Sequence, residues 1–324
     1  MHLLRKAWHS AVGPVALVSA IALAFLCLAD PASAGNQKVV GVTLFNFQNP
    51  YVATVGDAMK VEAAKLDIDL VSLDSARNVT TELYQVENLI ARKVDLIVMN
   101  PVDQNTSQAA AKLINKAGIP LVLLTTKFAD DFTSDGGKFV TYVGSEDIVA
   151  GEIEGQYLAD KLPEGGNVVY LVIVYGPSVT ARRKAGFESV IKNYPKLSIV
   201  SELQGNASRA KAKVIMESLL QKYGKGQLQA VVAQNDEMAI GASSAIEAAD
   251  RHGEFKVLIG VNGSKPALDA IMAGTLTASV FQDGVGQGAQ AVAAASKILA
   301  GESVEPQFLI PFKLVTKENV FSFR

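Results

Sequence analysis

The chain has 324 residues, of which 49% are hydrophobic and 19% are charged, and its formal net charge is −2 at pH 7. This balance excludes the strongly basic character that binding to nucleic acid or to an anionic membrane surface requires. A chain of this length and apolar content can bury two substantial cores, so we expect two domains.

Residues 1–34 have the pattern of a removable export signal. Arg5 and Lys6 supply positive charge, residues 15–28 are almost entirely apolar, and Ala32-Ser33-Ala34 supplies a small-residue cleavage site. Because the apolar run is short for a membrane span, we predict cleavage after Ala34 rather than an uncleaved anchor. Cleavage would remove the only Cys and the only Trp of the chain, so the mature protein would contain no disulfide.

Beyond the signal, short apolar runs alternate with segments of helical periodicity. Strands are predicted at residues 39–45, 69–73, 96–99, 120–124, 139–143, 167–174, 198–203, 230–233, 257–261 and 277–281. Helices are predicted from residue 50, at 80–92, 106–117, 178–193, 208–222, 265–273 and 288–300, and after residues 147 and 235. Strict alternation predicts right-handed parallel sheets with helices on both faces. The order of elements is the same in both halves, which indicates two similar lobes facing one cleft.

Two charged regions need an interpretation of their own. Residues 127–138 interrupt the alternation, and we interpret them as a solvated surface loop, with a lid over the cleft as the alternative. The acidic pairs Asp130-Asp131 and Glu152 with Glu154 are interpreted as solvated charges on a loop and on an exposed helix face. Under this interpretation neither pair forms a metal site or a catalytic acid pair.

Polar side chains follow the carboxyl ends of two predicted strands. Gln234 and Asn235 come directly after the strand at 230–233, and Asn100 comes after the strand at 96–99. Open α/β sheets bind their ligands at this edge. Amides offer donors and acceptors but no nucleophile, so the pattern indicates a site that holds a ligand rather than one that cleaves it.

Several short motifs occur along the chain in a fixed order. They are Asn49-Pro50-Tyr51, Asn100-Pro101, Gly118-Ile119-Pro120, Arg183-x-x-Gly186-Phe187, Ala233-Gln234-Asn235-Asp236-Glu237-Met238-Ala239, Gly260-x-Asn262-Gly263 and Ala278-x-Val280-x-Gln282. In this order they resemble the periplasmic sugar-binding proteins of ABC importers, the group typified by the ribose-binding protein. The resemblance covers nearly all of the chain after the signal, and the run at 233–239 is its most specific part.

The resemblance implies an α/β fold of the periplasmic binding protein type I, in which two Rossmann-like lobes with parallel sheets are joined by a three-crossing hinge. The crossings are expected near residues 144–145, 282–283 and 311–313. The N-terminal lobe would contain residues 35–144 and 283–311, and the C-terminal lobe residues 145–282 and 312–324. Hinge closure would clamp a sugar between the lobes.

The resemblance also implies a set of ligand-binding residues. The predicted ligand contacts are Phe45, Asn46, Asn49, Tyr51, Asn100, Thr125, Arg182, Asn235, Asn262 and Gln282. Amides would bind sugar hydroxyls, and Tyr51 would stack on the apolar face of the ring; a helix cap for Asn235 and a core aromatic for Tyr51 are the alternatives. The family's ligand arginine falls at Ala181 here, so we assign its role to Arg182 and interpret Arg183 as the structural arginine.

The chain departs from the ribose-type pattern at three places. Asn262 stands where the family has Asp, Thr125-Thr126 stands where it has an Asp-Arg pair, and Ala207 stands where an aromatic is common. A buried polar group without a partner costs about 1–3 kcal/mol, enough to reject a ligand. Ribose therefore fits poorly, and a related pentose, a polyol or a less polar cyclic ligand fits better.

The leading hypothesis is a monomeric periplasmic receptor that delivers a small neutral sugar or polyol to an ABC permease in the inner membrane. The alternatives are the effector-binding domain of a regulator and a two-lobed glycoside-processing enzyme. An export signal stands where a regulator would have its DNA-binding segment, and the matched cleft positions offer no carboxylate pair. We therefore predict no catalytic residue, no metal, no cofactor and no nucleic-acid partner. Docking to a chemoreceptor is compatible with this hypothesis.

Overall fold

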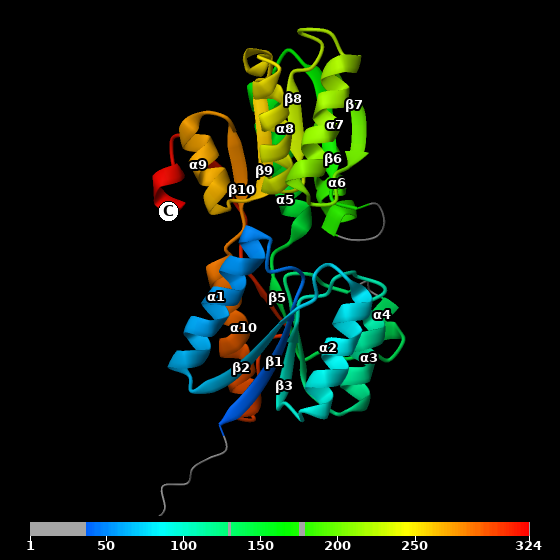
Figure 1. Ribbon diagram of the computed structural model, residues 1–324, viewed down its shortest axis with the longest axis vertical. Helices are drawn as coiled ribbons and strands as arrows, with labels where there is room; N and C mark the ends of the chain where they lie inside the picture. Colours follow the sequence, from blue (N-terminus) through cyan, green and yellow to red (C-terminus); the bar gives the residue numbers. More distant parts are fainter. Residues whose placement is uncertain (1–36, 129–130, 175–178, 324) are drawn as a thin grey trace, which may run out of the picture. The chain divides into compact units, whose positions relative to one another are not determined.

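The computed structural model describes residues 37–128, 131–174 and 179–323. The predicted export signal and Asp130 lie outside these ranges. The described residues form two lobes, each built around a six-stranded sheet (Figure 1). Among them, none of the helices combines the length and the apolar character needed to cross a bilayer.

The first lobe contains a fully parallel sheet with the strand order β11-β5-β4-β3-β1-β2. Its strands are β1 (Lys38–Leu44), β2 (Ile68–Asp74), β3 (Leu96–Met99), β4 (Leu121–Leu124), β5 (Thr141–Gly144) and β11 (Gln307–Leu309). Its helices are α1 (Pro50–Lys65), α2 (Val79–Ala91), α3 (Gln108–Lys116), α4 (Asp131–Ser134) and α10 (Gly284–Leu299). Helices α1 and α10 pack side by side on one face of the sheet, and α2 and α3 cover the other (Figure 1).

Strand β3 shows why the sequence forms this layered structure. Leu96 and Val98 pack on the side of α1 and α10, and Ile97 and Met99 pack on the side of α2 and α3. A strand between two helical layers buries both faces, so it is apolar at every position instead of at alternate ones. The same requirement applies to β4, whose four residues are all buried.

The second lobe repeats this architecture with the strand order β12-β10-β9-β8-β6-β7. Its strands are β6 (Gly166–Val172), β7 (Leu197–Gln204), β8 (Ala230–Ala233), β9 (Val257–Asn262), β10 (Ala278–Phe281) and β12 (Lys313–Thr316). Its helices are α5 (Asp147–Lys161), α6 (Val179–Ile191), α7 (Arg209–Lys222), α8 (Asp236–Ala248) and α9 (Lys265–Ala273), with 3-10 turns η1 (His252–Glu254) and η2 (Val320–Phe323). The strand β12 pairs antiparallel with β10, an edge strand that the alternation did not predict.

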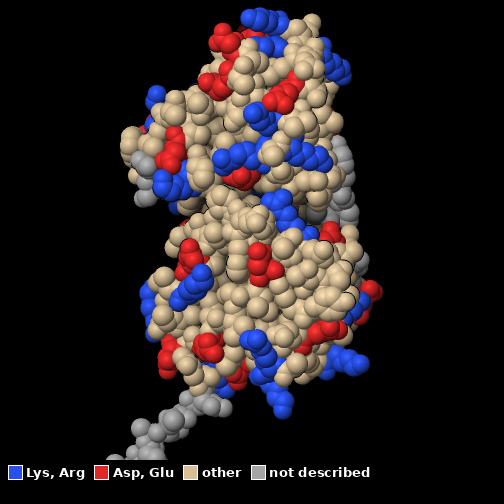
Figure 2. Space-filling view, viewed as in Figure 1, with Lys and Arg blue, Asp and Glu red and all other residues tan. Residues whose placement is uncertain are grey.

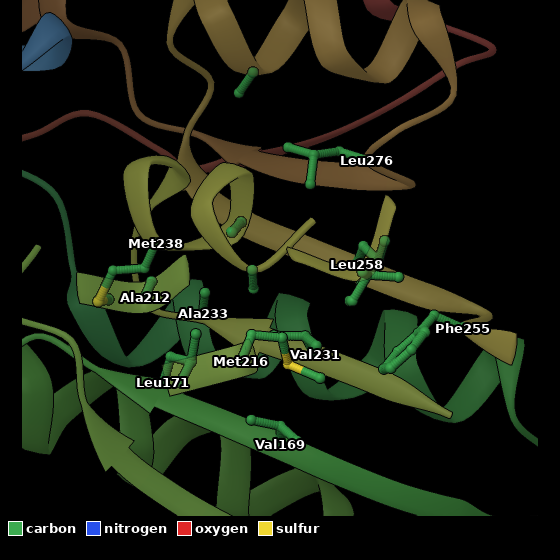
Figure 3. Close-up of a cluster of buried hydrophobic side chains, with 14 of the residues drawn as sticks. Val169, Leu171, Ala212, Met216, Val231, Ala233, Met238, Phe255, Leu258 and Leu276 are labelled. Atoms are coloured by element: carbon green, nitrogen blue, oxygen red, sulfur yellow. The ribbon is translucent and has the colours of Figure 1, made fainter. Parts of the chain in front are cut away.

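Both faces of the second sheet are also covered. Helices α5 and α6 pack on one face, and α7, α8 and α9 pack on the other. Figure 3 shows part of the second core, where Met216 of α7 and Met238 of α8 lie over Val231 and Ala233 of β8. Burial of this apolar surface stabilises the folded state by about 25 cal/mol for each Å² that is removed from water.

The chain passes between the two sheets three times, after β5, after β10 and between β11 and β12. Helix α10 begins at Gly284, four positions earlier than the sequence predicts, and Asp283 caps it by accepting a hydrogen bond from the Gly286 nitrogen at 2.8 Å. Glycine has a low helix propensity, but a Cβ at Gly288 would come within 2.4 Å of the Val55 oxygen of α1. Close packing of α1 against α10 therefore overrides the local propensity.

The prediction of a solvated loop at 127–138 is wrong in part. Phe128 and Phe132 are buried, their ring centroids lie 4.6 Å apart, and both pack in the core beneath α2 and α3. Residues 131–134 form the short helix α4. The described residues of this segment pack against their own lobe, and none of them lines the cavity described below.

The prediction of solvated acidic side chains holds for Glu152, which is exposed, and is wrong for Glu154, which is 0% exposed. Glu154 lies on the buried side of α5, because α6 packs closely against this helix at Gly151 and Gly155. Neither carboxyl oxygen of Glu154 has a hydrogen-bond partner among the described residues. Burial raises its pKa well above the ordinary value for Glu.

On the face shown in Figure 2, Lys and Arg side chains are interspersed with Asp and Glu side chains over both lobes. This distribution agrees with the near-neutral net charge of −2.

Candidate functional site

A cavity of about 160 Å³ lies where the carboxyl ends of the strands of both lobes meet. The lining residues at or just after strand ends are Phe45, Asn100, Thr125, Ile173, Asn235, Asn262 and Gln282. The other lining residues are Asn49, Tyr51, Val52, Pro101, Val102, Asp103, Gln104, Thr126, Asp147, Val174, Val179, Thr180, Arg183 and Ala207. One water molecule needs roughly 10–15 Å³ of such space, so the cavity suits a ligand of monosaccharide size.

All the residues predicted to bind ligand line this cavity except Asn46 and Arg182. Asn46 is buried, and its Oδ1 accepts a hydrogen bond from the Gln48 nitrogen at 3.1 Å. Arg182 directs its Nη1 to Glu146 Oε1 at 3.6 Å, and the structure places the neighbouring Arg183 at the cavity instead. Ligand contact itself stays a prediction for the whole set.

Asn49 and Asn235 each lie at the start of a helix, Asn49 before α1 of the first lobe and Asn235 before α8 of the second. Asn49 Oδ1 accepts from the Tyr51 nitrogen at 3.0 Å, and Asn235 Oδ1 accepts from the Met238 nitrogen at 3.0 Å. Both therefore cap a helix and line the cavity at once, so the two interpretations offered for Asn235 are compatible. Because each side-chain oxygen accepts a hydrogen bond from the helix backbone, each amide can donate to a ligand hydroxyl through its NH2 group.

Tyr51 and Thr125 are joined by Gln287, a buried residue of α10 that the sequence did not single out. Tyr51 Oη donates to Gln287 Oε1 at 2.8 Å, and Thr125 Oγ1 donates to the same oxygen at 2.9 Å. Gln287 Nε2 donates to Ser145 Oγ at 2.9 Å, and Ser145 Oγ donates to the Ile310 oxygen at 2.6 Å. This chain of bonds links two cavity residues to two of the three crossings between the lobes.

Thr125 also has an unusual backbone. Its φ of 61° is uncommon for a residue with a branched Cβ, and it is held there by the Tyr142 hydroxyl, which donates to the Thr125 oxygen at 2.9 Å. Residues with an unfavourable backbone conformation of this kind cluster at ligand-binding and switch sites. Burial raises the pKa of both Tyr51 and Tyr142, so their hydroxyls stay protonated and act as hydrogen-bond donors.

Asn100 holds the ends of two strands in place. Its Oδ1 accepts from the Phe45 nitrogen at 3.3 Å, and its Nδ2 donates to the Leu124 oxygen at 3.2 Å. Both ends of the amide are therefore used within the first lobe, and Asn100 positions Phe45 at the cavity edge.

Glu82 of α2 supports the cavity wall at 101–104. Its Oε1 accepts from the Val102 nitrogen at 2.9 Å, and its Oε2 accepts from the Ser107 hydroxyl. Burial raises the pKa of Glu82 to about 7, and both hydrogen bonds act in the opposite direction.

Arg183 and Asp147 form a buried ion pair at the wall of the second lobe. Arg183 Nε donates to Asp147 Oδ1 at 3.0 Å, and the side chains are 4% and 9% exposed. Arg183 Nη1 donates to the Gln234 oxygen, which fixes the turn that carries Asn235. Burial raises the pKa of Asp147, and the guanidinium opposes this shift.

Gly186 allows α6 and α5 to come close enough for Arg183 and Asp147 to form this ion pair. A Cβ at Gly186 would lie 2.0 Å from the Ile148 oxygen, so only glycine lets α6 approach α5 this closely. The Arg183-x-x-Gly186 spacing in the sequence is therefore a signal for the pair, although it does not reveal Asp147 as the partner.

Asn262 and Gln282 pair with each other across β9 and β10, since Asn262 Nδ2 donates to Gln282 Oε1 at 3.0 Å. Beneath them, Asp236 accepts from Ser279 Oγ at 2.6 Å and from the Ser264 nitrogen at 2.7 Å. Burial raises the pKa of Asp236 to about 6, and these hydrogen bonds lower it. Asp236 therefore supports the turn after β9 and is not among the residues that line the cavity.

The residues that line the cavity present amide and hydroxyl groups together with aromatic and aliphatic surface. They also include two carboxyl groups, both of which already make bonds within the protein. Asp147 pairs with Arg183, and Asp103 Oδ1 accepts from the nitrogens of Asn105 and Thr106. Glycoside hydrolysis needs one carboxyl group free to donate a proton and a second free to act as base or nucleophile. Within the described ranges, no group of three or more His, Cys, Asp or Glu side chains could hold a metal ion. The arrangement is suited to binding a polar, uncharged molecule.

The family model described as "Periplasmic binding protein domain" matches residues 40–303. The chain therefore belongs to the periplasmic binding protein family. It is 33% identical to the ribose import binding protein of Bacillus subtilis over 90% of this chain and 92% of that one. Identity to the ribose import binding protein of Escherichia coli is 32%, over 93% and 97% of the two chains.

A solved structure of the same family gives the same fold. It is the ABC transporter solute binding protein from Bacillus halodurans with bound myo-inositol, which is 34% identical, covers 89% of this chain and 97% of its own, and superposes with a TM-score of 0.82. The prediction of a two-lobed type I periplasmic binding fold is confirmed. These relatives are binding proteins of import systems, in agreement with the prediction that the protein is not an enzyme.

Proposed function

We propose that this member of the periplasmic binding protein family captures a neutral monosaccharide or cyclic polyol between its lobes and delivers it to an ABC importer. The observation that supports this best is the cavity at the strand ends of both lobes, with Asn49 and Asn235 on opposite walls. Ligands of this kind have many hydroxyl groups, which pair well with amides that can donate as well as accept.

The charge of the cavity favours an uncharged ligand. Arg183 is the only Lys or Arg among the lining residues of the described chain, and Asp147 already pairs with it. An anionic ligand would have to compete with that carboxylate, and a cationic one would face the guanidinium. A neutral ligand avoids both costs.

The kind of ring that the ligand contains is inferred from the cavity residues that differ from those of the ribose group. Thr125 and Thr126 occupy a wall where the ribose group has an Asp-Arg pair, so they present hydroxyls instead of charges. We infer that a cyclic polyol or hexose fits this wall better than ribose, and the myo-inositol bound by the relative from Bacillus halodurans is the first candidate.

The export route and the partners are part of the same proposal. We propose cleavage after Ala34, a mature monomer in the periplasm, and a permease that recognises the two lobes in their closed arrangement. We also propose the lobe limits 35–144 with 283–311 and 145–282 with 312–324, and a chemoreceptor as an additional partner.

A thermal-shift panel of pentoses, hexoses, linear polyols and cyclitols tests the ligand class. At one hundred times its Kd a ligand stabilises the folded state by about 2.7 kcal/mol, which raises the Tm by several degrees. We expect this for a neutral cyclic polyol or hexose, and a smaller shift for ribose. A shift with anionic compounds only, or turnover of any sugar by the purified protein, would contradict the proposal.

Asn235→Ala and Asn235→Asp separate binding from folding. The Asp variant keeps the helix cap but removes the NH2 donor, whereas the Ala variant loses both and costs about 1 kcal/mol of stability. We expect at least a tenfold weaker affinity for both by calorimetry. Asn78→Ala is the matched control, because Asn78 caps α2 through the Thr81 nitrogen and does not line the cavity. Equal affinity of all three variants would rule out a ligand role for Asn235.

A further inference from the structure

Two loops at equivalent places in the two lobes have an unusual backbone. The loop after β2 contains Ala76 and Arg77 with φ of 50° and 60°, and the loop after β7 contains Asn206 and Ala207 with φ of 56° and 49°. Left-handed conformations are unfavourable for residues with a Cβ, and two in succession are rarer still. In both lobes the shape of this loop is held by tertiary contacts.

The contacts that hold the loops are hydrogen bonds to the strand ends at the cavity. The Arg77 nitrogen donates to the Phe45 oxygen at 2.8 Å, and the Asn206 nitrogen donates to the Ile173 oxygen at 2.9 Å. Phe45 and Ile173 both line the cavity. Each loop is therefore fixed to the wall of its own lobe.

The side chain of Arg77 joins the two loops across the cleft. Its Nη1 donates to the Asn206 oxygen at 3.0 Å, and its Nη2 is 3.4 Å from the Ala207 oxygen. The guanidinium also lies over the Phe45 ring, 5.8 Å from the ring centroid. A single side chain of the first lobe thus contacts the second lobe and covers an aromatic residue of the cavity.

This contact lies far from the crossings within each sheet. Strands β2 and β7 form one edge of their sheets, and the crossings follow β5, β10 and β11, which lie at or next to the opposite edge. Rotation of one lobe about the crossings therefore separates the loops more than it separates the residues near the hinge. Such a rotation would break the bonds from Arg77 to Asn206 and Ala207.

We propose that Arg77 is a positioning residue that fastens the second lobe over the bound ligand. The inference rests on the proposed binding function and assigns a specific residue to cleft closure. A contact made only in the closed state shifts the equilibrium towards that state and raises ligand affinity by the same factor. Because the bonds break before the ligand leaves, the change should appear mainly in the dissociation rate.

The test compares Arg77→Ala with Arg92→Ala, which removes the same charge from the same lobe at an exposed position, the C-terminal end of α2. We expect Arg77→Ala to weaken polyol binding by roughly threefold to tenfold and to speed ligand release, and Arg92→Ala to change neither. Cooperative denaturant unfolding without ligand should show that both variants are folded. Equal affinities for the two variants would overturn the proposal.

A second measurement needs no ligand and so remains informative if the proposed function fails. Spin labels at Tyr84→Cys on α2 and Val214→Cys on α7, both exposed sites, report the separation of the lobes. In the ligand-free protein Arg77→Ala should shift the label distances to longer values, and Arg92→Ala should not. Unchanged distances in Arg77→Ala would contradict a fastening role, whereas absence of sugar binding by every variant would contradict only the binding function.

Discussion

Arg183→Met is expected to lower the free energy of unfolding by about 3–5 kcal/mol and to abolish ligand binding. The substitution leaves Asp147 buried without its partner, since the Nε to Oδ1 bond of 3.0 Å is lost. It also removes the donor to the Gln234 oxygen and so loosens the turn that carries Asn235. Urea unfolding and calorimetric titration with the ligand from the panel measure the two effects.

Arg182→Met is the matched control on the same helix. Arg182 is 32% exposed and lies 3.6 Å from Glu146, so its loss should change stability by less than about 1 kcal/mol. Adding Asp147→Asn to Arg183→Met should recover part of the lost stability, because the uncompensated charge is then removed. Equal destabilisation by the two arginine variants would show that the buried pair does not have the importance we assign to it.

Glu154→Gln is expected to increase stability above pH 5, by an amount that grows with pH. Burial raises the pKa of Glu154 in the folded protein, so the folded state keeps a proton that the unfolded chain releases near its ordinary pKa. The free energy of unfolding contributed by this group is therefore fully present at low pH and is lost as the pH rises towards the folded pKa. Between the two pKa values the loss is about 1.4 kcal/mol per pH unit.

Gln cannot ionise, so the variant lacks this loss while it keeps nearly the same shape. The charged and titrating groups nearest Glu154 are Arg183, Asp236 and Tyr170, and they are the same in both proteins. Denaturant unfolding at pH 5, 6, 7 and 8 should show the stabilities of parent and variant diverging as the pH rises towards the folded pKa of Glu154. Glu152→Gln, an exposed position on the same helix, should follow the parent. Parallel curves for Glu154→Gln and the parent would mean that Glu154 is solvated or paired in solution.

The fold was predictable because its central strands carry a strong local signal. The sequence predicts strands at 96–99 and 230–233, and β3 and β8 occupy those residues. Strands covered by helices on both faces must be apolar throughout, which is visible without knowledge of the partner strands. The start of α10 at Gly284 was not predictable in this way, because packing against α1 decides it.

The candidate site was predictable where a strand end determines the position of a side chain. Asn100, Asn235 and Gln282 come just after strands, and all three line the cavity. Helix residues are different, because neighbouring positions on a helix point about 100° apart. Arg182 and Arg183 are therefore the same residue type at neighbouring positions, but Arg182 is partly exposed and Arg183 is buried. Only the orientation of α6 against α5 decides which of the two is buried.

By itself the sequence determined the alternation of strands and helices, the polarity of the strand ends and the family to which the chain belongs. Only the tertiary structure decided which polar groups are paired, as in the bond between Tyr51 and Gln287 across 236 positions. It also decided which groups have no hydrogen-bond partner among the residues that the structure describes, as in Glu154. Local propensity acts over a few residues along the chain. Burial and hydrogen bonding depend on groups brought together from distant segments, so they are fixed only when both lobes have folded.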